Sequence, residues 1–398
     1  MKATEIAETS LERPAARILS PATFRGLTLK SRLVVSPMCT YSANQGLLDD
    51  FHLVHLGRFA MGGAGLVFVE ATAVNKSARI THGCAGLWND AQIGPMKRVA
   101  DFLHRFGSAA GIQLSHAGPK ASSQRPWEGG GPLGEKDLEA RGEGPWLVES
   151  VTTTPFDTGW AKPSKMTTAE IAATGAAFVD AAKRADAADF DVIEIHCAHG
   201  YLLHSFLSPI SNARDDEYGG DLAGRMRFPL EVIAAVRQNW PERKPLFVRI
   251  SSVDGIGVGW SIDDSVAFAK ALKAIGVDAI DCSSGGMKLE RAQNFLWRGP
   301  GFHVPFAERI RTEAGVPTIA VGLIRDADQA EAILAEKKAD LVSIVREALF
   351  DPNWPARSAL AVAGERGWSL WPEQFAWWLS RRERQEKDGY GPRRDRNS

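Results

Sequence analysis

The chain has 398 residues, of which 44% are hydrophobic and 24% are charged, with a formal net charge of −1. A chain of this length and composition can bury a large core, and it has no excess of basic charge that would attract nucleic acid. It contains no apolar run of the ~20 residues needed to span a bilayer, and residues 1–14 lack the apolar centre of a secretory signal.

From about residue 30 one pattern repeats eight times: a short apolar run, a polar turn, and a longer segment of helical periodicity. The apolar runs are residues 33–38, 65–72, 110–115, 190–196, 246–251, 279–283, 318–322 and 341–346. Strands that are apolar on both faces and alternate with helices pair in parallel through right-handed crossovers. The pattern predicts an α/β fold, a single (β/α)8 TIM barrel, with a doubly wound open sheet as the alternative.

Several intervening segments carry clear helix signals. Thr167 is a predicted N-cap, with Glu170 three residues later, before a helix over 171–188. Helical spacing also covers 221–237 and 263–275, and the latter segment ends at a glycine that suits the position after a helix.

The domain organisation follows from two breaks in the repeat. Residues 17–362 form the predicted barrel, preceded by an N-terminal extension over 1–16. Residues 117–166 are a long insertion after the third strand, rich in Gly and Pro, which we expect to be a lid or capping segment, with a disordered surface loop as the alternative. An aromatic C-terminal extension covers 363–388, and a disordered tail is expected over 389–398.

The four cysteines stand far apart and form no C-x-x-C motif. This spacing argues against a disulfide framework, structural zinc and an iron–sulfur cluster. We therefore expect a reduced, cytoplasmic protein.

Polar side chains gather at the predicted carboxyl ends of the strands, where barrels place their chemistry. Gln113 and Arg249 interrupt apolar runs, and an unpaired buried polar group costs several kcal/mol. One interpretation is a buried ion pair, in which Glu70 or Glu194 supplies the carboxylate for Arg249. The other is a flat heteroaromatic ligand with imide edges, such as an isoalloxazine ring whose negative charge Arg249 would stabilise on reduction.

The last two strand ends suit a phosphate. Gly322 allows close approach of the backbone, and Arg346 adds a cation. A phosphate site after the seventh and eighth strands recurs in this class of barrel. A single phosphate indicates FMN rather than a dinucleotide, and the glycines over 255–259 have the wrong spacing for a dinucleotide fingerprint.

The densest group of reactive side chains is His196, Cys197, His199 and Tyr201. A zinc site is one interpretation, but a barrel metallohydrolase would need more ligands from other strands. The other interpretation is a pair of imidazoles that donate hydrogen bonds to a carbonyl or nitro oxygen. Tyr201, with an ordinary pKa of about 10, is then a proton donor.

These motifs together resemble Old Yellow Enzyme over roughly residues 17–355. The matching segments are Ser36-Pro37-Met38-Cys39-Thr40-Tyr41, residues 70–74, 112–118 and 196–201, and the runs 203–209 and 212–227. Cysteine at position 39 with tyrosine two residues later resembles the thermophilic-like branch, which includes xenobiotic reductases.

The resemblance implies an FMN-dependent, NAD(P)H-consuming ene-reductase, with NADPH favoured, that reduces C=C bonds activated by carbonyl or nitro groups. Hydride would pass from flavin N5 and a proton from Tyr201, in a ping-pong scheme. His196 and His199 would hold the oxygen of an enone, nitroalkene or maleimide, and Cys39 would lie beside the flavin C4 carbonyl. The implied FMN ligands are Ser36, Pro37, Met38, Cys39, Ala71, Gln113, Arg249, Gly322, Val345 and Arg346.

The resemblance also implies pocket walls and an assembly. Tyr41, Trp297 and Trp378 are expected to line the substrate pocket, with Trp377 or Trp378 reaching the active site of a neighbouring subunit in a homodimer or homotetramer. A helix docked on its own barrel is the alternative for this aromatic segment. Val345 departs from the family's usual glycine, which weakens the expected backbone contact to phosphate.

Two rival functions use the same residues. A dienoyl-CoA reductase or amine dehydrogenase has a similar barrel but carries a cysteine-rich cluster that this sequence lacks. A non-catalytic flavin-binding redox sensor would use Cys39 as a reactive thiol.

Overall fold

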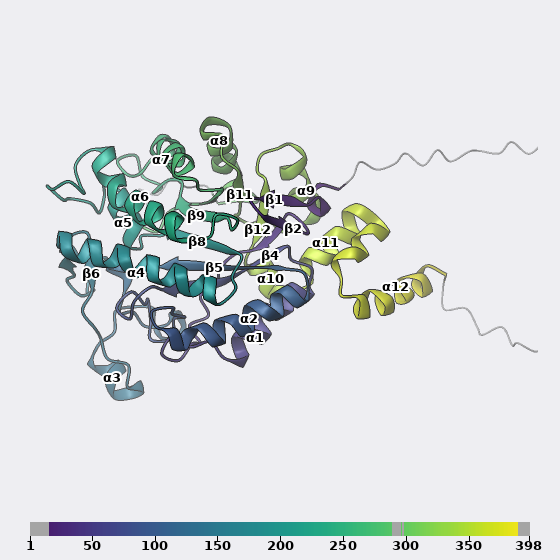
Figure 1. Ribbon diagram of the computed structural model, residues 1–398, viewed down its shortest axis with the longest axis horizontal. Coiled ribbons are helices and arrows are strands. Elements are labelled where there is room, and N and C mark those ends of the chain that lie inside the picture. Colours follow the sequence, from purple (N-terminus) through teal and green to yellow (C-terminus); the bar gives the residue numbers. More distant parts are fainter. Residues whose placement is uncertain (1–15, 289–295, 297, 389–398) are drawn as a thin grey trace, which may run out of the picture.

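The computed structural model describes residues 16–288, 296 and 298–388, and its centre is a closed barrel of eight parallel strands (Figure 1). The barrel closes because the last strand pairs with the first, with Val342 opposite Leu33. This closure confirms the predicted (β/α)8 barrel and excludes the open sheet. In order around the barrel, the strands are β3 (Leu33–Val35), β4 (Leu66–Ala73), β5 (Ala109–Ser115), β8 (Val192–Cys197), β9 (Leu246–Ser251), β10 (Ala279–Ser283), β11 (Thr318–Ala320) and β12 (Leu341–Ile344).

One long helix follows each strand and covers the outside of the barrel. The ring of helices comprises α1 (Asp50–Met61), α2 (Ile93–Arg105), α4 (Thr168–Ala187), α6 (Leu222–Asn239), α7 (Ile262–Ile275), α8 (Val304–Ala314), α9 (Ala327–Ala335) and α11 (Trp354–Ala363). Shorter helices are η1 (Arg17–Leu19), η2 (Asp90–Gln92), α5 (Leu202–Leu207) and α10 (Arg346–Phe350).

Local sequence signals set the ends of these helices. The Thr167 side chain accepts a hydrogen bond from the Glu170 backbone, and Asp221 does the same for Gly224. Gly276 ends α7 with a φ of +99°, a left-handed conformation that favours glycine. The three predicted helices are therefore present, and the caps expected at Thr167 and Gly276 are confirmed.

Inward-facing side chains change from apolar to polar along the barrel axis. Because alternate residues of a strand face the same side, Phe247, Arg249 and Ser251 of β9 all point to the interior. Near the amino ends of the strands, the interior is filled by an apolar cluster that includes Phe68 and Phe247. The hairpin of β1 (Ala22–Phe24) and β2 (Leu27–Leu29) closes this end, with Phe24 packed edge-on against Phe247. The polar layers are left at the carboxyl ends.

The insertion after β5 carries secondary structure of its own and lies at the left-hand end of the molecule in Figure 1. It contains η3 (Gly118–Lys120), η4 (Pro126–Glu128), α3 (Glu135–Arg141), and the parallel pair β6 (Glu149–Ser150) and β7 (Ser164–Lys165). The C-terminal extension, η6 (Gly364–Leu370) and α12 (Glu373–Asp388), lies at the right-hand end. The expected N-terminal extension and C-terminal tail fall almost wholly outside the described residues.

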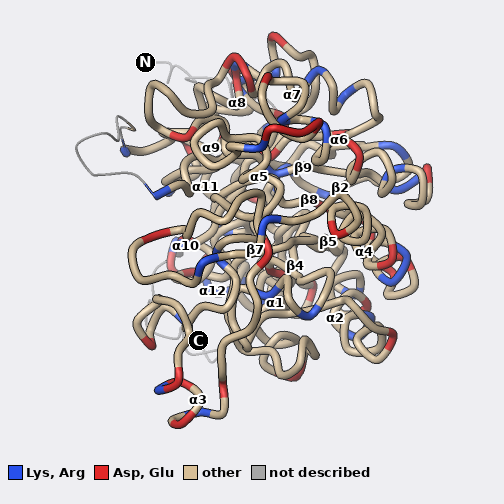
Figure 2. Tube along the Cα trace, turned by 90° about the vertical axis from the view of Figure 1, so that its left-hand side faces the viewer, with Lys and Arg blue, Asp and Glu red and all other residues tan. Residues whose placement is uncertain are grey.

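Charges of both signs are distributed over the surface. Viewed from the end that carries the insertion, Lys and Arg are interspersed with Asp and Glu (Figure 2). Among the described residues, no helix is both long enough and apolar enough to cross a membrane.

Candidate active site

His196, His199 and Tyr201 converge at the carboxyl end of β8. The ring centroids of His196 and His199 are 5.1 Å apart, and those of His196 and Tyr201 are 5.0 Å apart. A tight turn brings them together, in which His199 and Gly200 have φ values of +61° and +74°. A Cβ at position 200 would lie 2.4 Å from the Gly286 carbonyl oxygen, so the turn requires glycine there.

Hydrogen bonds from two other strands and from the insertion hold the position of His199. Its backbone N–H donates to Ser251 Oγ at 2.9 Å, and its Nε2 lies 2.7 Å from Ser283 Oγ. Lys120, from the insertion after β5, donates to the carbonyls of His199 and Gly286 at 2.7 and 2.6 Å. Burial lowers the pKa of Lys120 to about 8. The two histidines therefore stand on a turn fixed from several sides.

A buried dyad supports the same turn from below. Gly200 donates its N–H to His204 Nδ1 at 2.8 Å, and His204 Nε2 lies 3.1 Å from Asp254 Oδ1. Ser208 and the Trp260 backbone also donate to Asp254, at 2.6 and 2.7 Å. This network fixes the peptide between His199 and Tyr201.

The protonation states of the three site residues suit oxygen binding and proton donation. The Ala198 N–H donates to His196 Nδ1 at 3.3 Å, so the proton of a neutral His196 sits on Nε2. Burial, followed by the charge of Arg249, lowers the pKa of both His196 and His199 well below the usual value. Burial raises the pKa of Tyr201 well above 10, so its hydroxyl keeps its proton at neutral pH.

Gln113, Glu194, Arg249 and Asp281 form the polar interior of the barrel. Gln113 Nε2 donates to Glu194 Oε1 at 2.7 Å, which uses one of the two N–H groups of the amide. Arg249 Nε lies 3.4 Å from Asp281 Oδ2. The expected ion-pair partner of Arg249, Glu70 or Glu194, was wrong: β9 and β10 are neighbours, and their register places Asp281 directly opposite Arg249, while Glu194 only feels the Arg249 charge.

Glu70 instead fixes the loop that follows β3. It accepts hydrogen bonds from Thr40 Oγ1 at 2.5 Å, from Thr40 N–H at 3.1 Å, and from Tyr41 N–H at 3.5 Å. Tyr41 has a φ of +52°, which a tyrosine seldom adopts without such support. Burial raises the pKa of Glu70 to about 7, and burial together with Glu70 raises the pKa of Cys39 well above 9.

A cavity of about 190 Å³ lies at the carboxyl ends of β9 to β12. Gly322, Arg249, Val345 and Arg346 line it, as do Ser343 and His303. Gly322 has a φ of +111°, and a Cβ there would lie 3.0 Å from His303 Nδ1, so the close packing of His303 against this backbone requires glycine. Glu194 Oε2 is buried and has no hydrogen-bond partner among the described residues, and neither does Arg249 Nε, although it forms an ion pair with Asp281. These buried polar atoms without hydrogen bonds, and the Arg346 cation at the cavity, fit the ring edge and phosphate of FMN.

The other predicted FMN ligands lie along the strands that flank this interior. Pro37, Met38 and Cys39 follow β3, and Ser36 Oγ lies 2.5 Å from Ser343 Oγ on β12. Ala71 sits beside Gln113 in the register of β4 and β5, at an irregularity that follows Val69. The structure therefore brings the predicted FMN ligands to one end of the barrel.

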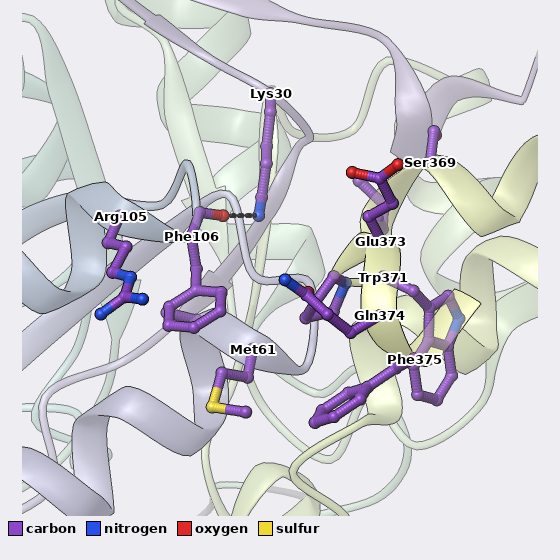
Figure 3. Close-up of a pocket in the computed structure, with 12 residues that line it drawn as sticks. Lys30, Met61, Arg105, Phe106, Ser369, Trp371, Glu373, Gln374 and Phe375 are labelled. Carbon is purple, nitrogen blue, oxygen red and sulfur yellow. Dashed lines mark hydrogen bonds between the residues drawn. The ribbon is translucent and has the colours of Figure 1, made fainter. Parts of the chain in front are cut away.

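Two predicted pocket residues are not brought there. Trp297 lies outside the described residues. Trp378 lies on α12, which belongs to the extension at the opposite end of the molecule (Figure 1). A cavity of about 430 Å³ at that end is lined by Phe106, Trp371 and Phe375, and Lys30 donates to the Phe106 carbonyl at 2.8 Å (Figure 3). That cavity is remote from His196 and Tyr201, and entry of Trp378 into a neighbouring subunit stays a prediction.

Sequence reasoning missed several residues that support the site. Asp281 carried the same signal as Arg249, a charge inside an apolar run, and could have been found by it. Lys120 is the lone cation of residues 110–124, next to a predicted strand end. Ser283 was named only as part of a strand end, and His303 gave no signal because it follows a long loop.

A closed barrel with buried polar groups at its interior and a cavity suited to phosphate defines a (β/α)8 enzyme that holds a planar, phosphate-bearing cofactor. The model of the NADH:flavin oxidoreductase / NADH oxidase family matches residues 17–363. The chain belongs to this family, that of Old Yellow Enzyme, which confirms the resemblance stated from its motifs.

The similar proteins agree with this assignment. An NADPH dehydrogenase of Geobacillus thermodenitrificans (strain NG80-2) is 43% identical over 361 residues, covering 88% of this chain and 98% of the relative. An NADPH dehydrogenase of Bacillus subtilis (strain 168) is 42% identical over 364 residues, covering 89% of this chain and 100% of the relative. The solved structure of morphinone reductase has a TM-score of 0.71 at 23% identity, covers 89% of this chain and 92% of that one, and shows the shared fold. The chain is thus an FMN-dependent oxidoreductase that uses NADPH.

Proposed function

We propose that the protein is an ene-reductase that reduces C=C bonds activated by a carbonyl or nitro group. The observation that carries the proposal is the convergence of two neutral imidazoles and a protonated phenol at one end of the barrel interior. Two N–H donors aimed at one oxygen withdraw electrons from a conjugated C=C bond, and a nearby phenol supplies the proton. Enones, nitroalkenes and maleimides share this chemistry.

Each FMN ligand has a proposed place. Gln113 and Arg249 would meet the polar edge of the ring, and Gly322, Val345 and Arg346 the phosphate. The segment from Ser36 to Cys39, with Ala71, would line the ring. When bound, FMN would supply hydride transfer from NADPH to the substrate, in the two half-reactions of a ping-pong scheme.

The protein's own groups then act on the substrate. His196 Nε2–H and His199 bind the substrate oxygen, while the hydrogen bonds of Ala198 to the His196 ring and of Ser283 to the His199 ring keep the two rings in place. Tyr201 protonates the carbon next to the activating group. Tyr41 lines the same pocket, and Trp297 and Trp378 are its further proposed walls.

The experiment substitutes Tyr201→Phe and follows the half-reactions separately. NADPH should bleach the flavin at an unchanged rate, because hydride transfer to the flavin needs no proton from Tyr201. Reoxidation by 2-cyclohexenone should slow by roughly 10-fold or more, since general acids contribute about 10²–10⁴-fold. Tyr218→Phe is the matched control, because that hydroxyl donates to Glu231, outside the site. Normal reoxidation of a folded Tyr201→Phe variant would contradict the role.

The redox-sensor alternative needs a reactive thiolate at Cys39. Burial and the neighbouring Glu70 raise the pKa of that thiol, which keeps it protonated and poorly nucleophilic. Such a sensor would bind FMN yet show no steady-state consumption of NADPH with any enone. The dienoyl-CoA reductase or amine dehydrogenase alternative lacks support because the four cysteines stand apart and are free.

We also propose a cytoplasmic homodimer or homotetramer. Trp377 and Trp378 on α12 are 52% and 68% exposed, and such indoles are enriched at interfaces between subunits. Light scattering of the purified protein measures the assembly, and a monomer mass at micromolar concentration would contradict it.

A further inference from the structure

His303 lies in the cavity of about 190 Å³ that contains Gly322 and Arg346. It directly precedes α8, and the residue is only 6% exposed. Its Nε2 lies 2.7 Å from Ser284 Oγ. Its Nδ1 is buried and has no hydrogen-bond partner among the described residues. One nitrogen of the ring is therefore held by the protein, and the other is left for a ligand.

An unpartnered buried nitrogen is costly enough to need an explanation. Leaving such a group without a hydrogen bond costs roughly 1–3 kcal/mol, and the great majority of buried polar atoms have a partner. Burial, followed by the charge of Arg249, lowers the pKa of His303 to about 3, so the ring is neutral and carries one N–H. When the Ser284 hydroxyl donates to Nε2, that proton must sit on Nδ1, which makes Nδ1 a donor facing the cavity.

The position of Gly322 shows which ligand atoms can reach Nδ1. A Cβ at Gly322 would lie 3.0 Å from His303 Nδ1, so this nitrogen packs closely against the Gly322 backbone, and both residues line the cavity. A group bound in the cavity next to Gly322 is therefore also next to His303. Arg346 lines the same cavity and is exposed, with its positive charge available to an anion.

We propose that His303 donates a hydrogen bond from Nδ1 to the phosphate of FMN, and that Ser284 orients the ring for this purpose. The proposal goes beyond FMN binding itself, because it assigns the selection of FMN over riboflavin to a residue on the loop after β10. A neutral hydrogen-bond donor beside Arg346 would fix the orientation of the phosphate, which the charge of Arg346 alone does not specify.

Two substitutions separate the two ring nitrogens. His303→Asn places an amide nitrogen where Nδ1 lies and gives up the contact to Ser284. His303→Gln reaches toward Ser284 and gives up the group that faces the cavity. Flavin is removed from the full-length wild-type protein and from each variant, and the dissociation constants for FMN and riboflavin are measured by flavin fluorescence. The thermal midpoint of each flavin-free protein reports its folding.

We expect His303→Gln to weaken FMN binding by about 10- to 100-fold, the effect of losing one hydrogen bond to a charged group. Riboflavin binding should change by less than about 2-fold, and His303→Asn should keep most of the preference for FMN. Ser284→Ala, which leaves the cavity-facing ring intact, should give a smaller loss for FMN alone and serves if the His303 variants do not fold.

Three results would overturn the proposal. An equal loss for FMN and riboflavin would assign His303 to the sugar chain or to the fold. Unchanged FMN binding in His303→Gln and Ser284→Ala would mean that the phosphate does not meet this ring. Failure of the wild-type protein to bind FMN would overturn the proposed function as well, and the wild-type titration alone reveals that case.

Discussion

At the residue scale, two carboxyl groups and one guanidinium share the buried interior of the barrel. Glu194 and Asp281 stand near Arg249, so one guanidinium faces two carboxyl groups. Burial, and then the charge of Asp281, raises the pKa of Glu194 to about 8, and burial also raises the pKa of Asp281. A proton held at this pair reduces the cost of burying the second acid.

This raised pKa predicts that Glu194→Gln changes the stability of the flavin-free protein to a degree that depends on pH. Between about pH 4.5 and pH 8, the folded protein keeps a proton at Glu194 that the unfolded chain has lost, so wild-type stability falls as pH rises. The neutral amide has no such dependence. Between pH 5.5 and pH 8, the free energy of unfolding of the variant should rise by at least about 1 kcal/mol relative to that of the wild type. This is the free energy of roughly one pKa unit.

Denaturant unfolding across this pH range measures the effect. Glu149→Gln is the control, because the neighbouring His116, whose Nε2 lies 3.8 Å from Glu149 Oε2, lowers the pKa of Glu149. The Glu149→Gln difference should therefore stay flat from pH 5.5 to pH 8. A flat difference for Glu194→Gln as well would show that Glu194 ionises normally.

Single residues were predictable where they broke a pattern. Gln113 and Arg249 could be identified because each is polar inside an apolar strand. The partner of Arg249 could not be predicted, because it depends on which strands are neighbours and on their register. The role of His303 could not be predicted either, since a loop places it at the cavity and no periodicity predicts the path of that loop.

Regular elements were more predictable than irregular ones. All eight barrel strands and the caps of α4 and α7 follow from periodicity and end signals in the sequence. The hairpin β1–β2 was missed because its strands have three residues each, too short to show alternation. The short elements of the insertion were missed because tertiary contacts, rather than local propensity, form them.

The insertion contacts the pocket through Arg125. Its Nε donates to the Tyr41 carbonyl at 3.1 Å, while its Nη atoms bind Glu143 at 2.6 and 2.8 Å. Trp127 lies on the same segment, with its ring 6.0 Å from that of Tyr41. The element expected to be a lid is thus tied to a residue expected to line the substrate pocket.

Arg125→Met should loosen this tie and raise the KM for 2-cyclohexenone by about 2- to 10-fold, the effect of one lost hydrogen bond. The FMN content should not change, because Arg125 does not contact the cofactor cavity. Arg141→Met is the matched control: Arg141 pairs with Asp137 and Glu128 in the same network but makes no bond to Tyr41. Equal KM changes in both variants, measured by steady-state kinetics, would argue that the network acts only on stability.

At the scale of the whole molecule, one end of the barrel is closed by apolar packing and the other end carries the candidate active site. Apolar packing of the hairpin and interior closes one end, and polar strand ends, loops and the insertion form the site at the other. The C-terminal extension lies with the closed end, so α12 cannot complete the site of its own barrel and is free to meet a second subunit.

The most direct test of the central claim is the absorption spectrum of the purified protein during anaerobic additions of NADPH and then 2-cyclohexenone. We predict a yellow protein that carries or takes up one FMN per chain, loses its flavin colour with NADPH, and regains it with the enone. A colourless protein that takes up no FMN would contradict the flavin site. Colour that NADPH bleaches but no enone, nitroalkene or maleimide restores would contradict the proposed ene-reductase.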